Sequence, residues 1–461
     1  MPIIYAARWV LPISSPMLEE GGVAVDNSRI VAVGPRRDVI SRFPEFRVED
    51  FGEAAILPGF INAHSHLELT VMRGFLEREE RDFFAWLRKL TLARMAMTSE
   101  DLLVSATCGA IEAARAGITL LADASSAATE AMSALGAIGL RGIVYQESFG
   151  PDPGLAKENL AKLRAQIEEL RQHESTLVRA GVSPHAPYTV SAPQLELISR
   201  LALDERLPLM IHAAESRAEE LLLREGRGFF AEGLKARGIE WQPPGTSTIQ
   251  YLSRHGVLET RPLLAHCINV DAEDLDLIYQ SRAGVAHCPK SNLKLGHGHA
   301  PVNRFLAREI KFGLGSDSVA SNNNCDLLEE ARFATLLARL SSDGKPDVNP
   351  TTRADFTSED ALFAATLGGA RSLGLDNQIG ALAEGMQADI AVVGLSASHQ
   401  QPVSNPVDTL IFSSSGRDVV MTVVAGKEVY RNNKVSGIDE GELGERIQKV
   451  RMKLDSAAVP G

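Results

Sequence analysis

The sequence has few cysteines, and their positions do not suggest disulfide bonds. Its four cysteines, Cys108, Cys267, Cys288 and Cys325, lie in apolar or loop contexts and share no paired spacing. Such usage is typical of a reducing compartment. The first twelve residues also lack the basic segment and the long apolar segment of a secretory signal. We therefore expect a cytoplasmic protein.

Long hydrophobic runs and an excess of positive charge are also missing. No uninterrupted apolar run approaches the roughly 18 residues of a membrane-spanning helix. The chain has 47 lysines and arginines against 59 aspartates and glutamates, which gives a net charge of -12. This charge disfavours nucleic acid and anionic membranes as partners. We expect neither, and we expect a small-molecule substrate instead.

Short apolar runs alternate with helical segments from residue 56 onward. One helical segment begins with a capping box at Thr98–Asp101 and ends at Gly117. Eight strand-and-helix units over about 300 residues predict an α/β fold of the (β/α)8 TIM barrel type, with its active site at the carboxyl ends of the strands. A doubly wound sheet is the alternative, but it would not bring eight strand ends around one point. The runs are AILPGFIN, GITLLADAS, RGIVYQESFG, LVRAGVSPH, LPLMIHAAE, RPLLAHCIN, AGVAHCPKSN and IKFGLGSDS.

Both ends of the chain have the pattern of short strands. Residues 1–56 contain valine-rich runs, with a hairpin expected at Asp26–Ser28, and residues 374–435 contain similar runs. We predict that these two ends form one small β-sandwich beside a barrel over residues 57–373. Residues 436–461 have the pattern of a charged amphipathic helix that caps the structure. Enzymes of this size often self-associate, so a homo-oligomer is compatible with the sequence.

The first candidate site follows the apolar run from Ala54 to Ile61, which ends in His64-Ser65-His66. If this run is one strand, side chains two residues apart point to the same face. Two imidazoles on one face form half of a zinc site. The pair alone is weak evidence, because His-x-His also occurs on ordinary surfaces.

Two later strand ends offer further ligands for the same ion. His212 ends the fifth apolar run and Asp317 ends the eighth. Alone, His212 is compatible with a core histidine and Asp317 with a turn or helix cap. A barrel would bring both to His64 and His66, where three imidazoles and one carboxylate suit a catalytic Zn²⁺, with Fe²⁺ or Mn²⁺ as alternatives. The fourth run has no lysine to bridge a second ion, so we expect one divalent metal ion.

Three further residues are candidates for catalysis and substrate binding. Glu215, three residues after His212, would pass a proton from water to a substrate nitrogen. His266, at the end of the sixth run, would polarise the water, and with Asp317 it would stabilise the tetrahedral species. His185, after the fourth run, would contact the substrate. A solvated glutamate and a buried core histidine are the structural alternatives for Glu215 and His266.

Other histidines are weaker candidates. His287 lies on the seventh run, before Cys288-Pro289. His297 and His299 also have His-x-His spacing, but they lie in the glycine-rich segment KLGHGHAP and not at a strand end. We interpret this pair as unrelated to the metal or as part of a lid.

Six motifs, in this order, resemble the amidohydrolase superfamily: PGFINAHSHLELTVMRG, SPHAPYTVS, IHAAES, LLAHCINV, CPKSNLKLGHGHAPV and GLGSDSVASNNNCDLLEE. The chain is similar to its mononuclear deaminase and chlorohydrolase branch, which includes S-adenosylhomocysteine/methylthioadenosine deaminases and aminodeoxyfutalosine deaminases. The resemblance implies a proton shuttle at Glu215, help at the leaving group from His266, and substrate contact at His185. It implies a metal ion, usually zinc, at His64, His66, His212 and Asp317.

The resemblance also implies a reaction, with one departure in the substrate site. We expect a metal-dependent hydrolytic deaminase that releases ammonia from an amino-substituted heteroaromatic ring of the adenosine type. A triazine chlorohydrolase, a cyclic amidohydrolase and a non-catalytic scaffold are the alternatives. Adenosine-type deaminases of this branch hold the ribose hydroxyls with an acid after a Trp-Leu pair, and here Leu92–Met97 occupies that place. Glu77, Glu79 and Glu80 are the nearby acids that could replace it.

Overall fold

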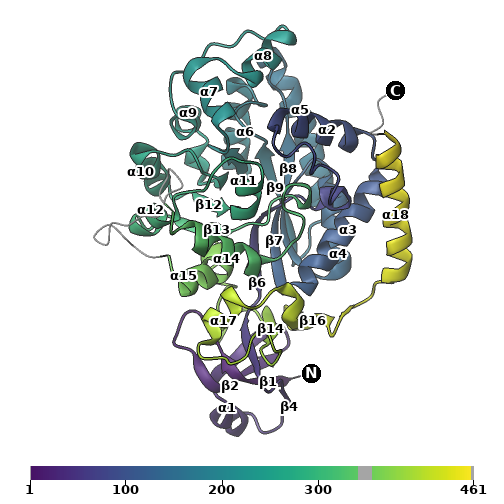
Figure 1. Cartoon of the computed structure of the whole chain (residues 1–461), viewed down its shortest axis with the longest axis vertical. Helices are drawn as coiled ribbons and strands as arrows, with labels where there is room; N and C mark the ends of the chain where they lie inside the picture. Colours follow the sequence, from purple (N-terminus) through teal and green to yellow (C-terminus); the bar gives the residue numbers. More distant parts are fainter. Residues whose placement is uncertain (1, 341–355, 458–461) are drawn as a thin grey trace.

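The computed structural model describes residues 2–340 and 356–457 (Figure 1). Eight parallel strands form two four-stranded sheets. Two backbone bridges, one between Val182 and Leu209 and one between Ser65 and Asp317, join these sheets into a closed ring. The first sheet contains β6 (Phe60–Ser65), β7 (Ile118–Ser125), β8 (Arg141–Ser148) and β9 (Val178–Pro184). The second contains β10 (Met210–Ala213), β11 (Leu263–His266), β12 (Gly284–His287) and β13 (Lys311–Leu314). The predicted TIM barrel is confirmed, and the doubly wound alternative is wrong because the ring closes.

Helices surround the ring of strands (Figure 1). The capping box before α3 is present: the Thr98 hydroxyl accepts from the Asp101 backbone N–H, and the Asp101 carboxylate accepts from the Thr98 backbone N–H. Gly117, at φ +79°, turns the chain from α3 into β7. The helices are α2 (Phe83–Met95), α3 (Ser99–Arg115), α4 (Ala128–Ile138), α5 (Ala156–Arg171), α6 (Ala192–Glu205), α7 (Arg217–Glu225), α8 (Phe229–Ala236), α9 (Thr248–Arg254), α10 (Ala272–Ser281), α11 (Pro289–Lys294), α12 (Val302–Ala307), α13 (Val319–Asn322), α14 (Leu327–Leu337), α15 (Ser358–Phe363) and α16 (Gly369–Ser372).

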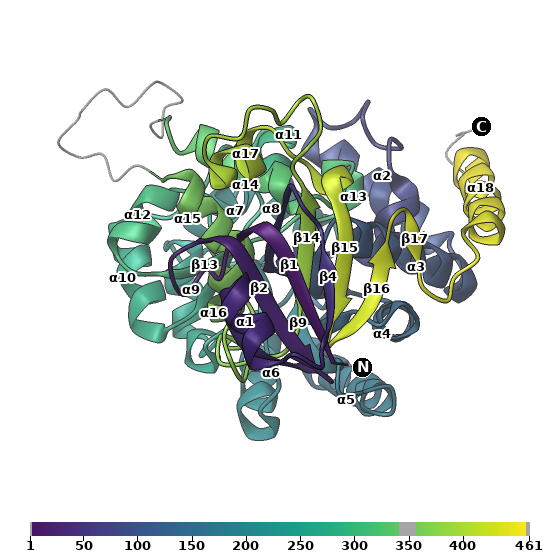
Figure 2. The ribbon, with the colours of Figure 1, turned by 90° about the horizontal axis from the view of Figure 1, so that it is seen from below.

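Both chain ends contribute to one further sheet of nine strands, seen from below the barrel in Figure 2. The two ends meet where β14 pairs antiparallel with β5, and the predicted hairpin joins β2 to β3. The sheet encloses an apolar core of its own. Its strands are β1 (Ile3–Val10), β2 (Leu18–Asp26), β3 (Arg29–Pro35), β4 (Arg47–Asp50), β5 (Ala54–Pro58), β14 (Ile390–Gly394), β15 (Val419–Val424), β16 (Lys427–Arg431) and β17 (Lys434–Val435).

The apolar run from Ala54 to Ile61 contains two strands, so its prediction as one strand is wrong. β5 pairs with β14 in the end sheet, whereas β6 pairs with β7 in the barrel. The chain changes sheets at Gly59, where a side-chain Cβ would lie 2.1 Å from the Thr119 methyl group. Periodicity could not show this change, because both strands are fully buried. The domain limits at residues 56, 373 and 435 stay a prediction.

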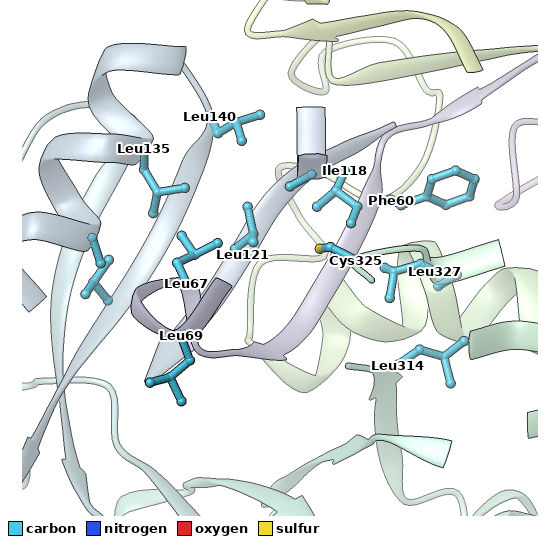
Figure 3. Packing of buried hydrophobic residues seen from close by; sticks show 14 of the residues in the cluster. Phe60, Leu67, Leu69, Ile118, Leu121, Leu135, Leu140, Leu314, Cys325 and Leu327 are labelled. Carbon is cyan, nitrogen blue, oxygen red and sulfur yellow. The ribbon is translucent and has the colours of Figure 1, made fainter. Parts of the chain in front are cut away.

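A large apolar cluster fills the space between the barrel strands and the helices. Figure 3 shows Leu121 of β7 beside Leu67, with Leu135 on one side and Phe60 on the other. Burial of such side chains removes apolar surface from water and is the main stabilising contribution to a domain of this kind. The cluster reaches both sides of the His64–His66 segment and therefore fixes its backbone.

Two other regions complete the fold. Helix α18 (Glu440–Ala457) lies along α3 (Figure 1), where Arg115 forms an ion pair with Glu440 at 2.5 Å. This position agrees with its prediction as a cap, and residues 458–461 of the predicted segment lie outside the described residues. Among the described residues, no helix combines the length and the apolar character needed to cross a membrane.

Candidate active site

The four predicted metal ligands lie together at the carboxyl end of the barrel. His64 is on β6, His66 follows it, His212 is on β10, and Asp317 follows β13. The Asp317 backbone N–H donates to the His64 carbonyl oxygen at 2.8 Å, where the ring closes. Ring closure therefore brings together residues that are about 250 positions apart in the sequence.

The distances among the four donor atoms fit a tetrahedral metal ion. Asp317 Oδ1 lies 3.3 Å from His64 Nε2 and 3.5 Å from His66 Nε2, and His66 Nε2 lies 3.3 Å from His212 Nε2. Bonds of about 2.0–2.1 Å to a tetrahedral ion place its ligand atoms about 3.3–3.4 Å apart. His64 Nε2 is buried and has no hydrogen-bond partner. This donor set therefore fits a divalent ion such as zinc.

Neighbouring groups orient these ligands. His212 Nδ1 lies 2.8 Å from the His185 carbonyl oxygen, which can only accept, so Nδ1 carries the proton and Nε2 is free toward the centre. Asp317 Oδ2 accepts from the Ser291 hydroxyl at 2.5 Å and from the Ser321 hydroxyl at 3.0 Å, which leaves Oδ1 facing the histidines. Such outer contacts fix the geometry of metal ligands.

The charge states of the ligands also suit a cation. Burial lowers the pKa of His64 to about 4 and lowers the pKa of His212 well below its ordinary value. Burial alone would raise the pKa of Asp317, but the facing imidazoles hold that pKa well below its usual range. At neutral pH the site therefore offers neutral imidazoles and a carboxylate, which are the protonation states that bind metal.

Two of the site residues have strained backbones. Asp317 has φ +56° and His266 has φ +76°. The left-handed region costs a non-glycine residue on the order of 1–3 kcal/mol, and such strain is concentrated at functional sites. Here the strain directs both side chains into the barrel mouth.

Glu215 lies between two histidines beside the ligand cluster. Its Oε1 is 3.7 Å from His266 Nε2 and 3.8 Å from His297 Nε2. Its backbone N–H donates to Glu219 at 3.1 Å, at the start of α7. The side chain is 8% exposed, so the structural alternative of a solvated glutamate is wrong. The carboxylate is instead in position to exchange protons within the cavity.

His266 is fully buried, and its ring lies against the metal-ligand cluster. Its Nδ1 is 2.8 Å from Asn292 Oδ1, and its ring and those of His64 and His212 bring donor atoms within 4.8 Å of one another. Burial by itself would lower the pKa of His266, but Glu215 and Asp317 outweigh burial and raise it. A cationic His266 can stabilise negative charge that develops in the cavity.

The cavity beside these residues is narrow and largely apolar. Its volume is about 80 Å³, compared with roughly 300–1,000 Å³ for typical ligand pockets. Side chains of α2 fill the space above the metal ligands. The residues that line the cavity include Phe83, Trp86, Leu87 and Leu90 of α2, together with His185, Tyr188 and Leu295.

His185 lines the cavity, as a substrate-contacting residue would. Its Nδ1 is 2.8 Å from the Thr189 hydroxyl, and its ring stacks on Phe149 at 4.7 Å. Burial lowers the pKa of His185 to about 3, so the imidazole is neutral. His185 therefore lies beside the metal-ligand cluster, and its contact with substrate stays a prediction.

The structure places further residues beside the site. His297, interpreted above as unrelated to the metal or as part of a lid, lies against Glu215, and its ring meets the edge of Phe83 at 4.6 Å. Its part in a lid stays a prediction. The preceding motif CPKSN provides Ser291 and Asn292, which bond to Asp317 and His266. Their place directly after a strand was the available signal. His287 is buried on β12 and does not line the cavity.

Comparisons with known proteins agree with this geometry. A model described as the amidohydrolase family matches residues 55–429. A 5-methylthioadenosine/S-adenosylhomocysteine deaminase of Pelotomaculum thermopropionicum is 31% identical over 98% of both chains. A crystal structure of an adenosine deaminase from Xanthomonas campestris with bound zinc is 26% identical, covers 98% of both chains and has a TM-score of 0.84. A structure of an atrazine chlorohydrolase from Arthrobacter aurescens complexed with zinc is 23% identical, covers 97% of this chain and 100% of its own, and has a TM-score of 0.83, a likeness of fold.

Proposed function

The chain belongs to the amidohydrolase family, and from this premise we propose that it is a metal-dependent deaminase that releases ammonia from a heteroaromatic ring. The observation that carries the proposal is the position of Glu215, which contacts His266 directly beside the His64, His66, His212 and Asp317 cluster. A proton carrier next to a metal site is what hydrolysis of an amidine carbon requires. The complete ligand set also disfavours the alternative of a non-catalytic scaffold.

The four clustered residues would hold one divalent ion. Zinc suits three imidazoles and one carboxylate, and Fe²⁺ or Mn²⁺ would accept the same donors. When bound, such an ion acts as a Lewis acid and brings the pKa of water from 15.7 down toward roughly 7–9. The fourth strand, β9, carries no lysine that could bridge a second ion.

Glu215 would transfer protons between water and the substrate. Its carboxylate takes a proton from the attacking water and delivers it to a ring nitrogen, so that the ring carbon accepts the oxygen. His266 and Asp317 would then stabilise the tetrahedral species. The second proton of the added water passes to the amino group, the bond between the ring carbon and this nitrogen breaks, and ammonia leaves while the oxygen becomes a ring carbonyl. His185 would contact the substrate.

The substrate we propose is an adenosine-type nucleoside. The relative from Pelotomaculum thermopropionicum is named for deamination of 5-methylthioadenosine and S-adenosylhomocysteine, and the zinc-bound structure from Xanthomonas campestris is named an adenosine deaminase. Both cover nearly the whole chain, including the end sheet. Displacement of chloride from a triazine and opening of a cyclic amide are the alternatives, because the same residues support them.

A product assay tests the function. Purified protein loaded with zinc is incubated with adenosine, 5-methylthioadenosine, S-adenosylhomocysteine, aminodeoxyfutalosine, atrazine and a cyclic amide. Ammonia, chloride and ring-opened acid are then measured separately. We expect ammonia from at least one adenosine derivative. Release of chloride or ring-opened acid, without ammonia from any nucleoside, would show that the proposal is wrong.

We also infer a cytoplasmic location, and a homo-oligomer is compatible with the sequence. The four cysteines are free thiols, three of them buried, which suits a reducing compartment. Light scattering on the purified protein measures the oligomeric state, and a single mass of one chain, 49.7 kDa, would contradict self-association.

A further inference from the structure

The acids that the sequence offered as ribose-binding groups are engaged elsewhere. Glu77 forms an ion pair with Lys294 at 2.9 Å, and both oxygens of Glu79 lie 3.0 Å from Lys89 Nζ. Glu80 lies 3.8 Å from the same Lys294. None of these acids lines the cavity. Their prediction as replacements is therefore not supported by their contacts.

The segment that should carry the ribose-binding acid also points away from the cavity. Leu92 and Met95 are 59% and 77% exposed. Arg94 turns inward instead, where it contacts Glu68 at 3.1 Å and the Ser126 hydroxyl at 2.9 Å. No residue from 92 to 97 lines the cavity. Any group that holds the sugar must come from another element.

Strands β6 to β8 bring three acids together at the barrel mouth. Two have partners: the oxygens of Glu68 accept hydrogen bonds from Ser125, Ser126 and the Ala127 backbone N–H. Asp123 Oδ1 accepts from the Ser65 hydroxyl and the Leu67 backbone N–H, both at 2.8 Å, and so supports the turn at His66, while its Oδ2 is buried without a hydrogen-bond partner. These two carboxyl groups therefore have structural tasks.

The third acid, Glu147 on β8, is only 7% exposed, and its Oε1 has no hydrogen-bond partner. Glu147 does not line the cavity itself, but one of its carboxylate oxygens lies within 4.8 Å of ring nitrogens of His185 and His212, which do. A buried carboxyl group with an unpaired oxygen is costly, and a donor from a ligand would relieve that cost.

We propose that Glu147 is a substrate-binding residue that accepts hydrogen bonds from the ribose hydroxyls, in place of the acid absent from residues 92–97. This inference rests on the proposed function. Apart from its reacting amino group, the donors of adenosine are its hydroxyls, because the remaining purine ring nitrogens accept hydrogen bonds. A carboxylate acceptor beside His185 therefore matches the sugar and not the ring.

The test compares adenosine with 2',3'-dideoxyadenosine, which has the same ring and the same 5'-hydroxyl but lacks the 2'- and 3'-hydroxyl donors that Glu147 is proposed to bind. Glu147→Gln keeps the side-chain shape and is assayed with each substrate. We expect kcat/KM for adenosine to fall about 10- to 100-fold, mainly through KM, since one charged hydrogen bond is lost. We expect the dideoxy substrate to change less than about threefold. Glu158→Gln, in an exposed ion pair with Lys162 on α5, is the matched control and should change neither value.

The outcomes separate this inference from the proposed function. Bound zinc and a melting curve like that of the wild type establish that Glu147→Gln is folded. If Glu147→Gln does not fold, the same measurements are made on Glu147→Asp. Equal losses for both substrates, or no loss for adenosine, would overturn the role of Glu147 while the wild type continues to release ammonia. A wild-type protein inactive on every nucleoside would overturn the proposed function and this inference together.

Discussion

Replacement of Glu215 by glutamine is the most direct test of the chemistry. An amide has nearly the same shape as the carboxylate but cannot take a proton from water. Glu215 Oε1 lies 3.7 Å and 3.8 Å from its histidine neighbours, beyond hydrogen-bond distance, so the substitution breaks no hydrogen bond of that oxygen. Proton transfer by a positioned side chain contributes about 10²- to 10⁴-fold to rate. We therefore expect kcat for Glu215→Gln to fall by this factor, about 2.7–5.4 kcal/mol in the barrier.

The assay must separate loss of the proton carrier from loss of the metal. Ammonia release is followed with the best adenosine derivative of the panel, and bound metal is measured on the same sample. The four ligand atoms do not include Glu215, so zinc content should equal that of the wild type. The control is Glu220→Gln, which should keep full activity. Glu220 is five residues after Glu215 and pairs with Arg217 and Arg224 on the surface of α7. More than a tenth of wild-type turnover in Glu215→Gln, with metal bound, would refute the assignment.

Three further predictions follow from the contacts described above. Ser291→Ala removes a hydroxyl that donates to Asp317, so zinc affinity measured by chelator competition should fall about 10- to 100-fold, and unchanged affinity would contradict a positioning role. Arg141 donates to both carboxylate oxygens of the buried Asp389, at 2.6 Å from Nε and 3.1 Å from Nη2, so Arg141→Met leaves this carboxylate without its partner. The free energy of unfolding measured in urea should fall by about 3–5 kcal/mol. A loss under 1 kcal/mol would show that this pair does not hold the end sheet to the barrel. Burial raises the pKa of Glu330 to about 8 from 4.5, so between these values the folded state binds more protons and its stability falls as pH rises. The melting temperature of Glu330→Gln relative to the wild type should therefore increase from pH 5 to pH 9, and a constant difference would contradict the shifted pKa.

Much of the fold could be predicted because its repeated strand-and-helix units have local hydrophobic patterns. Eight apolar runs separated by helical segments predict eight parallel strands, and the structure has them. The capping box at Thr98 also forms as its spacing predicts. The run from Ala54 to Ile61 was misinterpreted because two fully buried strands joined at Gly59 have the composition of one. Local pattern does not show which sheet a buried strand joins.

Some residues of the candidate site could likewise be predicted from the sequence, and others could not. His64, His66, His212 and Asp317 could be grouped from sequence because each falls at a strand end, and a barrel brings all strand ends to one mouth. His297 could not, since it lies in a loop whose path depends on the packing of Phe83 and α2. Glu147 lies at a strand end too, but nothing in the sequence distinguished it from Glu68 or Asp123. Only the folded chain shows that Glu68 and Asp123 Oδ1 accept hydrogen bonds while Glu147 Oε1 has no partner.

The sequence by itself determined the kinds of elements and the order in which they occur, because hydrophobic periodicity and helix caps act over a few residues. The tertiary structure alone decided which polar atoms are paired and which are left unpaired. Hydrogen bonds of the side chains at the barrel mouth join residues far apart in the chain, as from Asn62 to Ser316, and their geometry exists only after the ring of strands has closed.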